Sequence, residues 1–167
     1  RADMNQPRSC LGAAISMGRV YACGGDSAVL SGPNQDTLGN PIGTMEEFMP
    51  LSNSWVTKST MPTPRSDLSL TSAITGKIYA MGGYSQTPLN IVEEYDPMRD
   101  LWTTRAPMPT ARSLFGSALG AKDGKIYCIG GWGTKDQGWV LDAVECSDPS
   151  NNIGNALKPR PTPRGEL

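Results

Sequence analysis

The chain has 167 residues and a formal net charge of -1, with 15 Lys and Arg against 16 Asp and Glu, and it contains no histidine. A nearly neutral chain has no basic footprint for nucleic acid, so we do not expect a nucleic-acid partner. Without histidine, the chain cannot form a Ser-His-Asp triad or a metal or haem site with an imidazole ligand. No stretch reaches the roughly 18 consecutive apolar residues of a spanning helix, so we expect no membrane insertion.

The predicted elements are strands, because 19 Gly and 14 Pro interrupt every window long enough for a helical stripe. The clearest strands, in chain order, are 68–74, 77–81, 91–95 and 101–104. Gly76 lies between the first two and supplies the positive φ that a tight hairpin needs. The second of these strands is apolar on both sides, as expected for a strand covered on both faces.

The same markers return three times in one order, at a spacing near fifty residues. An arginine comes first, then an apolar-Tyr pair and two glycines, and then a glutamate. The arginines are Arg8, Arg65 and Arg112, with Arg164 opening a further copy; the glycine pairs begin at Gly24, Gly82 and Gly130; the glutamates are Glu46, Glu93 and Glu145. Self-similarity at this period predicts a stack of equivalent units rather than one core.

These markers resemble the kelch repeat, in which Met-x-x-x-Arg, a strand, a Gly-Lys or Gly-Arg turn, Ile/Val-Tyr, Gly-Gly, Val-Glu-x-Tyr-Asp-Pro and a Trp follow one another. The resemblance covers essentially the whole chain and implies an all-β fold of kelch-type β-propeller blades, each a four-stranded antiparallel sheet. It treats 1–167 as a single kelch region, with repeats at about 4–60, 61–107 and 108–160 and the start of a fourth at 161–167. Gly154 stands where the first two repeats have Trp55 and Trp102, so the third outer strand lacks an aromatic anchor.

About three blades make a partial propeller, because complete propellers have four to eight blades. The open flanks would expose sheet edges. We therefore expect further blades from the same protein, a second copy or a partner chain to complete the ring.

The resemblance also implies a partner site. In kelch ubiquitin-ligase substrate adaptors, the repeated arginine and the residue after Gly-Gly face the open mouth of the propeller, where acidic or phosphorylated peptides dock. Carried over, this predicts partner contacts from Arg8, Asp26, Arg65, Tyr84, Arg112 and Trp132. We add Trp139, because two indoles in one polar loop are unusual unless something covers them.

Two alternatives concern these same residues. The arginines could instead pair with Glu46, Glu93 and Glu145 to hold the fold, and the two loop tryptophans could pack on each other. The loop 26–44 is the longest insertion after a Gly-Gly pair, so we expect partner contacts from it as well. Its oxygen-bearing side chains lack the ordered spacing of a calcium loop.

The implied function is a non-catalytic protein-protein interaction module that binds a protein or an acidic peptide, with no catalytic residue, cofactor or metal. One alternative is a kelch-type propeller enzyme acting on sugars or sialic acid, with Arg65, Arg112 and channel carboxylates holding the substrate. Another is a structural accessory subunit of a large assembly. Adjacent glutamates such as Glu93 and Glu94 point to opposite faces of a strand, so they cannot form a paired-carboxylate site. Nothing resembles the BTB or BACK helices of ubiquitin-ligase adaptors.

Cys10, Cys23, Cys128 and Cys146 have neither metal-ligand spacing nor a tight disulfide framework. We expect Cys23 and Cys128 to be free thiols that pack as small hydrophobic groups. Together with the lack of an Asn-x-Ser/Thr sequon, this favours a reducing, intracellular compartment.

Overall fold

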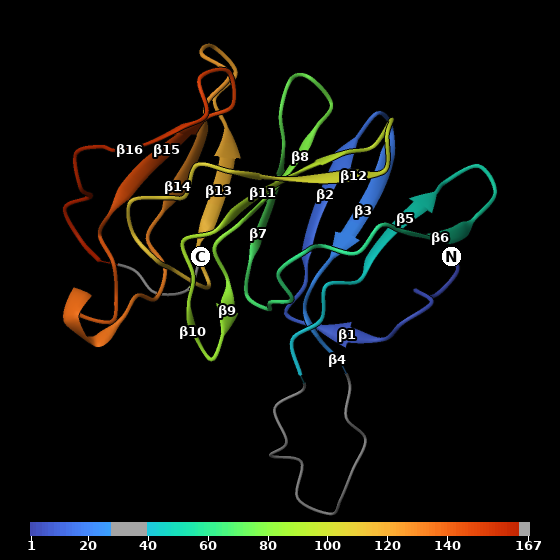
Figure 1. Ribbon diagram of the computed structural model, residues 1–167, viewed down its shortest axis with the longest axis horizontal. Coiled ribbons are helices and arrows are strands. Elements are labelled where there is room, and N and C mark those ends of the chain that lie inside the picture. The colour runs from blue at the N-terminus through green and yellow to red at the C-terminus, as the bar shows by residue number, and fades with distance from the viewer. Residues whose placement is uncertain (28–39, 164–167) are drawn as a thin grey trace, which may run out of the picture.

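The computed structural model describes residues 1–27 and 40–163, and within these ranges the fold is all-β apart from one 3-10 helix, η1 (Lys135–Gln137). Three antiparallel sheets of four strands each form the body of the molecule (Figure 1). They confirm the predicted class of kelch-type blades. None of the helices formed by the described residues is long and apolar enough to span a membrane.

We number the sheets as blades in chain order. Blade 1 contains β2 (Gly12–Ser16), β3 (Arg19–Cys23), β5 (Met45–Met49) and β6 (Ser54–Lys58). Blade 2 contains β7 (Ser69–Ser72), β8 (Ile78–Met81), β11 (Val92–Asp96) and β12 (Leu101–Arg105). Blade 3 contains β13 (Gly116–Leu119), β14 (Ile126–Ile129), β15 (Val144–Asp148) and β16 (Ile153–Ala156). In each blade the strands are hydrogen-bonded in chain order.

Two short ladders lie at one rim. β1 (Arg8–Ser9) pairs with β4 (Asp26–Ser27), and β9 (Tyr84–Ser85) pairs with β10 (Thr87–Pro88). Figure 1 shows these ladders at the lower end of the molecule, whereas the hairpin turns between the first two strands of each blade project at the upper end. We call these two ends of the molecule the ladder rim and the hairpin rim.

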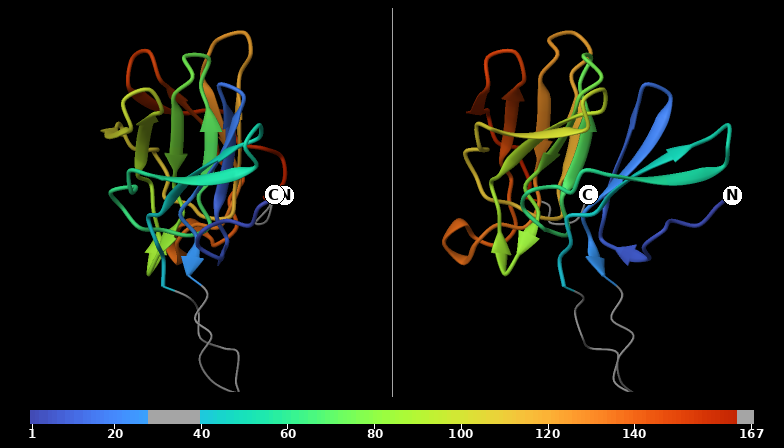
Figure 2. Two further views of the ribbon diagram at one scale, coloured as in Figure 1. Left: turned by 90° about the vertical axis from the view of Figure 1, so that its right-hand side faces the viewer. Right: turned by 45° about the vertical axis from the view of Figure 1, so that its right-hand side comes forward.

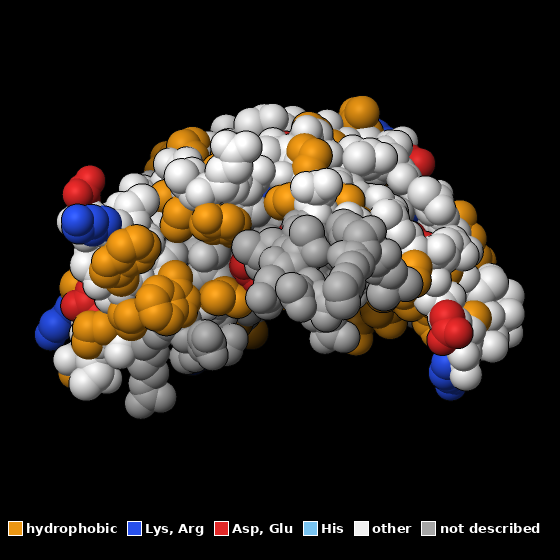
Figure 3. Space-filling model, turned by 90° about the horizontal axis from the view of Figure 1, so that it is seen from below, with side chains coloured by type: hydrophobic (Ala, Val, Ile, Leu, Met, Phe, Trp, Pro, Cys, Tyr) orange, Lys and Arg blue, Asp and Glu red, His pale blue; other side chains and the backbone are white. Residues whose placement is uncertain are grey.

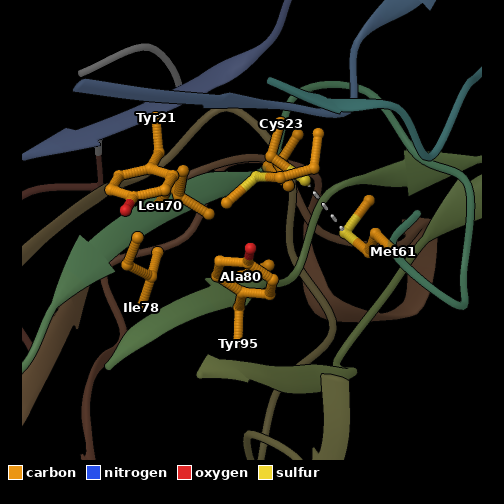
Figure 4. Close-up of a cluster of buried hydrophobic side chains, with 9 residues drawn as sticks. Tyr21, Cys23, Met61, Leu70, Ile78, Ala80 and Tyr95 are labelled. Carbon is orange, nitrogen blue, oxygen red and sulfur yellow. Dashed lines mark hydrogen bonds between the residues drawn. The ribbon is translucent and has the colours of Figure 1, made fainter. Parts of the chain in front are cut away.

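The blades stand side by side and are joined by two apolar layers (Figure 2). In the layer between blades 1 and 2, Tyr21 and Cys23 of β3 face Ile78, Ala80 and Tyr95 of blade 2 (Figure 4). Burial of such layers supplies most of the favourable free energy of folding. Because successive strand residues alternate between faces, Tyr79 and Met81 of β8 serve the second layer, against blade 3.

The cysteines agree with the prediction of free thiols. Cys23 and Cys128 are buried, one in each layer, and their sulfurs lie 3.8 Å from Met61 Sδ and 3.7 Å from Met81 Sδ. Burial raises the pKa of each thiol to about 12. These groups therefore act as protonated, apolar packing residues.

The first two glycine pairs bring their backbone against the segment that leads into the next blade. Gly83 has φ of 102° and donates its N–H to Arg112 O at 2.9 Å. A Cβ at Gly83 would lie 2.6 Å from Ser66 O. Glycine is required there both by the positive φ and by this close approach.

The outer strand of blade 3 forms although Gly154 replaces the tryptophan of the other blades. β16 pairs with β15 from Glu145↔Ala156 to Asp148↔Ile153. A Cβ at Gly154 would lie 2.5 Å from Pro107 O. The chain that leads into blade 3 thus fills the space that an aromatic ring would need.

Candidate interaction groove

The repeated arginines lie inside the blades. The side chains of Arg8, Arg65 and Arg112 have no solvent-exposed surface. This corrects the prediction that they line an open mouth, and the alternative of pairing with the repeated glutamates is confirmed. The sugar-enzyme alternative relied on Arg65 and Arg112 to hold a substrate, so this arrangement does not support it.

Each arginine ties the segment that leads into a blade to the third strand of that blade. Arg8 Nη2 lies 2.6 Å from Glu46 Oε2, and Arg112 Nη2 lies 2.9 Å from Glu145 Oε1. Backbone carbonyls accept further N–H groups, as Gly130 O does from Arg112 Nη1 at 3.0 Å, whereas the buried Nε of Arg8 and of Arg65 has no acceptor among the described residues. A buried charge is tolerated only when it is paired and hydrogen-bonded. The glutamates and backbone carbonyls provide this compensation for the buried guanidinium groups.

A groove of about 820 Å³ opens at the ladder rim. Its walls come from all three blades. The lining residues on which we build are Asp26, Asp67, Tyr84, Leu114, Trp132, Lys135 and Trp139. Figure 3 looks onto this rim: the outline is arched, and hydrophobic side chains gather on the arm that carries blade 3. The groove therefore contains the predicted site residues Asp26, Tyr84, Trp132 and Trp139, and excludes the predicted arginines.

Two of the aromatic residues occupy the same repeat position, directly after the glycine pair. Tyr84 forms a β-bridge with Ser66, and Trp132 forms one with Ser113. In both cases the partner is the residue after the buried arginine. The backbone that places the arginine inside the blade therefore also fixes the aromatic residue at the groove.

A braced loop positions Trp139. Gly133 N donates to Trp139 O at 2.7 Å, and Trp132 forms a β-bridge with Val140. Thr134 N donates to Gln137 Oε1 at 2.9 Å at the start of η1. Trp139 adopts φ of 63° and is 54% exposed, and positive φ is unusual for a bulky residue. The aromatic ring pairs found among the described residues do not include Trp132 with Trp139, so packing of the two indoles on each other is not supported.

Sequence reasoning missed the residues that follow the arginines, including Asp67 and Leu114. Both have positive φ, 53° and 49°, and they are joined by a hydrogen bond from Leu114 N to Asp67 O at 3.0 Å. Asp67 N in turn donates to Cys10 O at 2.9 Å. One backbone hydrogen bond thus links the segment that leads into each blade to the segment that leads into the next. The signal available in the sequence was their shared place, two residues after the repeated arginine.

The acidic end of the groove lies where blades 1 and 2 meet. Burial raises the pKa of Asp67, and the charge of Asp26 adds to this rise, while the nearby Cys10 thiol acts in the opposite direction. Neither carboxylate forms an ion pair with a cation among the described residues. Of the expected contacts from the loop 26–44, residues 28–39 lie outside the described part of the chain.

A smaller cavity of about 360 Å³ lies at the hairpin rim between blades 2 and 3. Its carboxylate, Glu94, is hydrogen-bonded to neighbouring side chains of the same protein. Glu94 accepts hydrogen bonds from Lys77 Nζ at 2.6 Å, from Arg105 Nε at 2.8 Å and from the Tyr79 hydroxyl. Glu93 faces Arg65 on the other side of the strand, which confirms that adjacent glutamates do not share one site.

Comparison with known proteins supports the same architecture. A family model described as the Kelch motif matches residues 69–109, the span from the first strand of blade 2 to the segment that leads into blade 3. No curated protein matches the chain. Blades 1 and 3 repeat the strand order of blade 2 and its arginine-glutamate pair. The segment 69–109 therefore carries a Kelch motif, and the described residues of the chain form three kelch-type blades that do not close into a ring.

Proposed function

We propose that this chain is a non-catalytic protein-protein interaction module that binds an extended segment of a partner protein in the groove. The observation that carries this proposal is the aromatic wall, which Tyr84, Trp132 and Trp139 contribute to one cavity. Tyr and Trp are enriched at the centres of protein interfaces, where each buries a large area with little loss of side-chain entropy. Kelch repeats commonly serve protein interaction, which agrees with this assignment.

The exposure of these side chains supports the proposal. Tyr84 is 39% exposed and Leu114 is 40% exposed. Together with Trp139, they place large apolar side chains around one concave surface, and clustered apolar groups of this kind mark interaction sites. The size of the groove also lies within the range of ligand pockets.

One polar atom favours a peptide as the occupant. The Nε1 of Trp132 is buried and has no hydrogen-bond acceptor among the described residues. A buried donor without an acceptor is costly, and an added acceptor removes that cost. An extended peptide offers a backbone carbonyl at every residue, so it could supply this acceptor while its side chains contact the aromatic wall.

A peptide library displayed on phage tests the proposal. The immobilised chain is used for selection, and each selected peptide is then measured against a groove variant, Tyr84→Ala with Trp139→Ala. The matched control is Leu51→Ala with Met98→Ala, which truncates two exposed apolar side chains in turns that do not line the groove. We expect peptides whose affinity falls at least about tenfold in the groove variant and stays unchanged in the control. Failure to select any peptide, or equal binding to both variants, would contradict the proposal.

A further inference from the structure

The charges around the groove indicate which kind of partner segment it binds, an inference that rests on the proposed function. In the blade interiors, Glu46, Glu93 and Glu145 are each neutralised by an arginine within 2.9 Å. Asp26 and Asp67 differ, because no cation of the described residues lies within ion-pair distance of either. The groove therefore holds two half-buried carboxylates whose charges the described fold leaves uncompensated.

The two carboxylates line the same groove, and the charge of Asp26 acts on Asp67. The negative charge of Asp26 contributes to the raised pKa of Asp67, and both carboxylates raise the pKa of the Cys10 thiol, on which burial has the largest effect. Like charges in a partly buried site disfavour ionisation. A cation placed between them would relieve the repulsion and gain attraction from both.

The order of the blades fixes where this acidic end lies. Asp26 belongs to β4, between β3 and β5 of blade 1, and Asp67 precedes β7 of blade 2. The backbone bonds from Asp67 to Cys10 and from Leu114 to Asp67 then lead toward blade 3. Trp132 and Trp139 follow blade 3's second strand and form the far wall. The groove thus runs from an acidic end to an aromatic end.

The rest of the lining does not cancel this polarity. Lys135 is the cation that lines the groove, and it lies on η1, in the loop between Trp132 and Trp139 at the aromatic end. The arginines that would have attracted an acidic segment are buried and paired. A metal ion is a weaker candidate, because the described residues contain no group of three carboxylate or thiol side chains that could hold one.

We propose that the groove selects a partner segment with a Lys or Arg side chain seated against Asp26 and Asp67 and an apolar side chain against Tyr84, Trp132 and Trp139. Arginine fits this site well, because its guanidinium can hydrogen-bond two carboxylates and can also stack on the Tyr84 ring. The preference is opposite to that of an arginine-lined mouth. An acidic peptide would meet two carboxylates without a compensating cation at that end.

Three synthetic ten-residue peptides test the preference. They share a Leu-Trp apolar half and carry Arg-Lys, Gln-Gln or Glu-Asp in the other half, and binding is measured by fluorescence anisotropy. The neutral peptide is expected to bind about tenfold more weakly than the basic peptide, and the acidic peptide more weakly again. The affinity of the basic peptide should fall as salt rises, whereas that of the neutral peptide should hardly change. Addition of EDTA should change none of these values.

A charge variant assigns the preference to the two carboxylates. Asp26→Asn with Asp67→Asn should lower the affinity for the basic peptide to that for the neutral one and leave the neutral peptide unaffected. Asn suits both positions, because it keeps the size of the side chain and tolerates the positive φ of Asp67. Asp96→Asn with Asp148→Asn removes two carboxylates outside the groove and should preserve the preference.

The results separate the two proposals. If all three peptides bind equally, or the acidic peptide binds best, and Tyr84→Ala with Trp139→Ala abolishes that binding, the charge preference is wrong and the interaction module stands. If binding of every peptide is indifferent to the groove variant, the interaction module itself is wrong. A preference for the basic peptide that survives Asp26→Asn with Asp67→Asn would overturn the assignment to these carboxylates.

Discussion

The guanidinium of Arg65 lies 2.5 Å from the carboxylate of Glu93, and both side chains are withdrawn from solvent inside blade 2. Arg65 also donates from Nη2 to Ala80 O at 3.0 Å, while its own carbonyl accepts the Gly25 N–H at 3.0 Å. One residue therefore connects the interior of blade 2 to the glycine pair of blade 1. This relationship explains why arginine, glycine pair and glutamate recur together in the sequence.

Replacing Arg65 with Met should strongly destabilise the fold, because it leaves Glu93 buried without its cation. We expect a loss of about 3–5 kcal/mol in the free energy of unfolding, measured by urea denaturation. Arg99→Met is the matched control: Arg99 is exposed and lies 3.9 Å from Asp96, so its loss should cost less than about 1 kcal/mol. Equal costs for the two variants would show that the buried pair does not hold the blade.

Gly83→Ala tests the close approach of the glycine pair of blade 2 to the segment that leads into that blade. Both the positive φ and the contact with Ser66 O oppose a side chain there, so we expect a cost of about 3 kcal/mol. Gly18→Ala shares the positive φ, 74°, but a Cβ there would meet no atom within 4 Å. It should cost about 1 kcal/mol. Thermal unfolding of both variants gives the comparison, and a cost at Gly83 no larger than at Gly18 would argue against the close approach to Ser66 O.

Restoring the repeat pattern at Gly154 should harm the protein. A tryptophan there matches Trp55 and Trp102 in sequence, but even its Cβ would overlap Pro107 O. We expect Gly154→Trp and Gly154→Ala to lower the free energy of unfolding by about 1–3 kcal/mol. Stabilisation by either substitution, measured in urea, would mean that the chain leading into blade 3 can move aside.

Glu94 should make stability depend on acidity. Burial raises its pKa, but hydrogen bonds from Arg105, Lys77 and Tyr79 outweigh burial and bring the pKa to about 2. A depressed carboxyl pKa contributes stability above the unfolded value, near 4.5, and that stability is lost as the pH falls toward 2. The free-energy difference between the wild-type protein and Glu94→Gln should therefore be largest above pH 5, at about 3 kcal/mol, and shrink on acidification.

Urea denaturation at about pH 6, 4 and 3 measures this difference in the free energy of unfolding. Asp136→Asn removes an exposed carboxyl on η1 and serves as the control, since it should change stability little at any of these values. A difference for Glu94→Gln that stays constant across the series would contradict the depressed pKa.

The fold could be predicted because the repeat unit encodes it redundantly. The strand expected at 77–81 appears as Ile78–Met81, since its two-sided apolar pattern matches burial between two blades. The strand expected at 68–74 is shorter, Ser69–Ser72. Apolar residues continue beyond the ladder, but Asp67 with positive φ precedes it and the turn bond from Ala73 N to Lys77 O follows it. Hydrophobicity alone does not mark where a ladder stops.

The site was harder to predict, because position in a repeat does not tell which way a side chain points. The residues after the glycine pairs, Tyr84 and Trp132, do line the groove. Arg65 and Arg112 lie inside because a glutamate recurs with each of them, and pairing in the interior satisfies both charges. Asp67 went unnoticed, since its positive φ cannot be read from its own residue type. Whether the groove residues contact a partner stays a prediction.

The most direct test of the interaction module is an NMR titration of the isotope-labelled 17.8 kDa chain with a phage-selected peptide. The account predicts that shifted amide signals cluster on the ladder rim, at Ser66, Asp67, Tyr84, Ser113 and Leu114, and that the Trp132 indole N–H signal moves as it gains an acceptor. Shifts that cluster instead on the hairpin rim, around Lys77, Asp123 and Ser150, with an unmoved Trp132 indole signal, would contradict it.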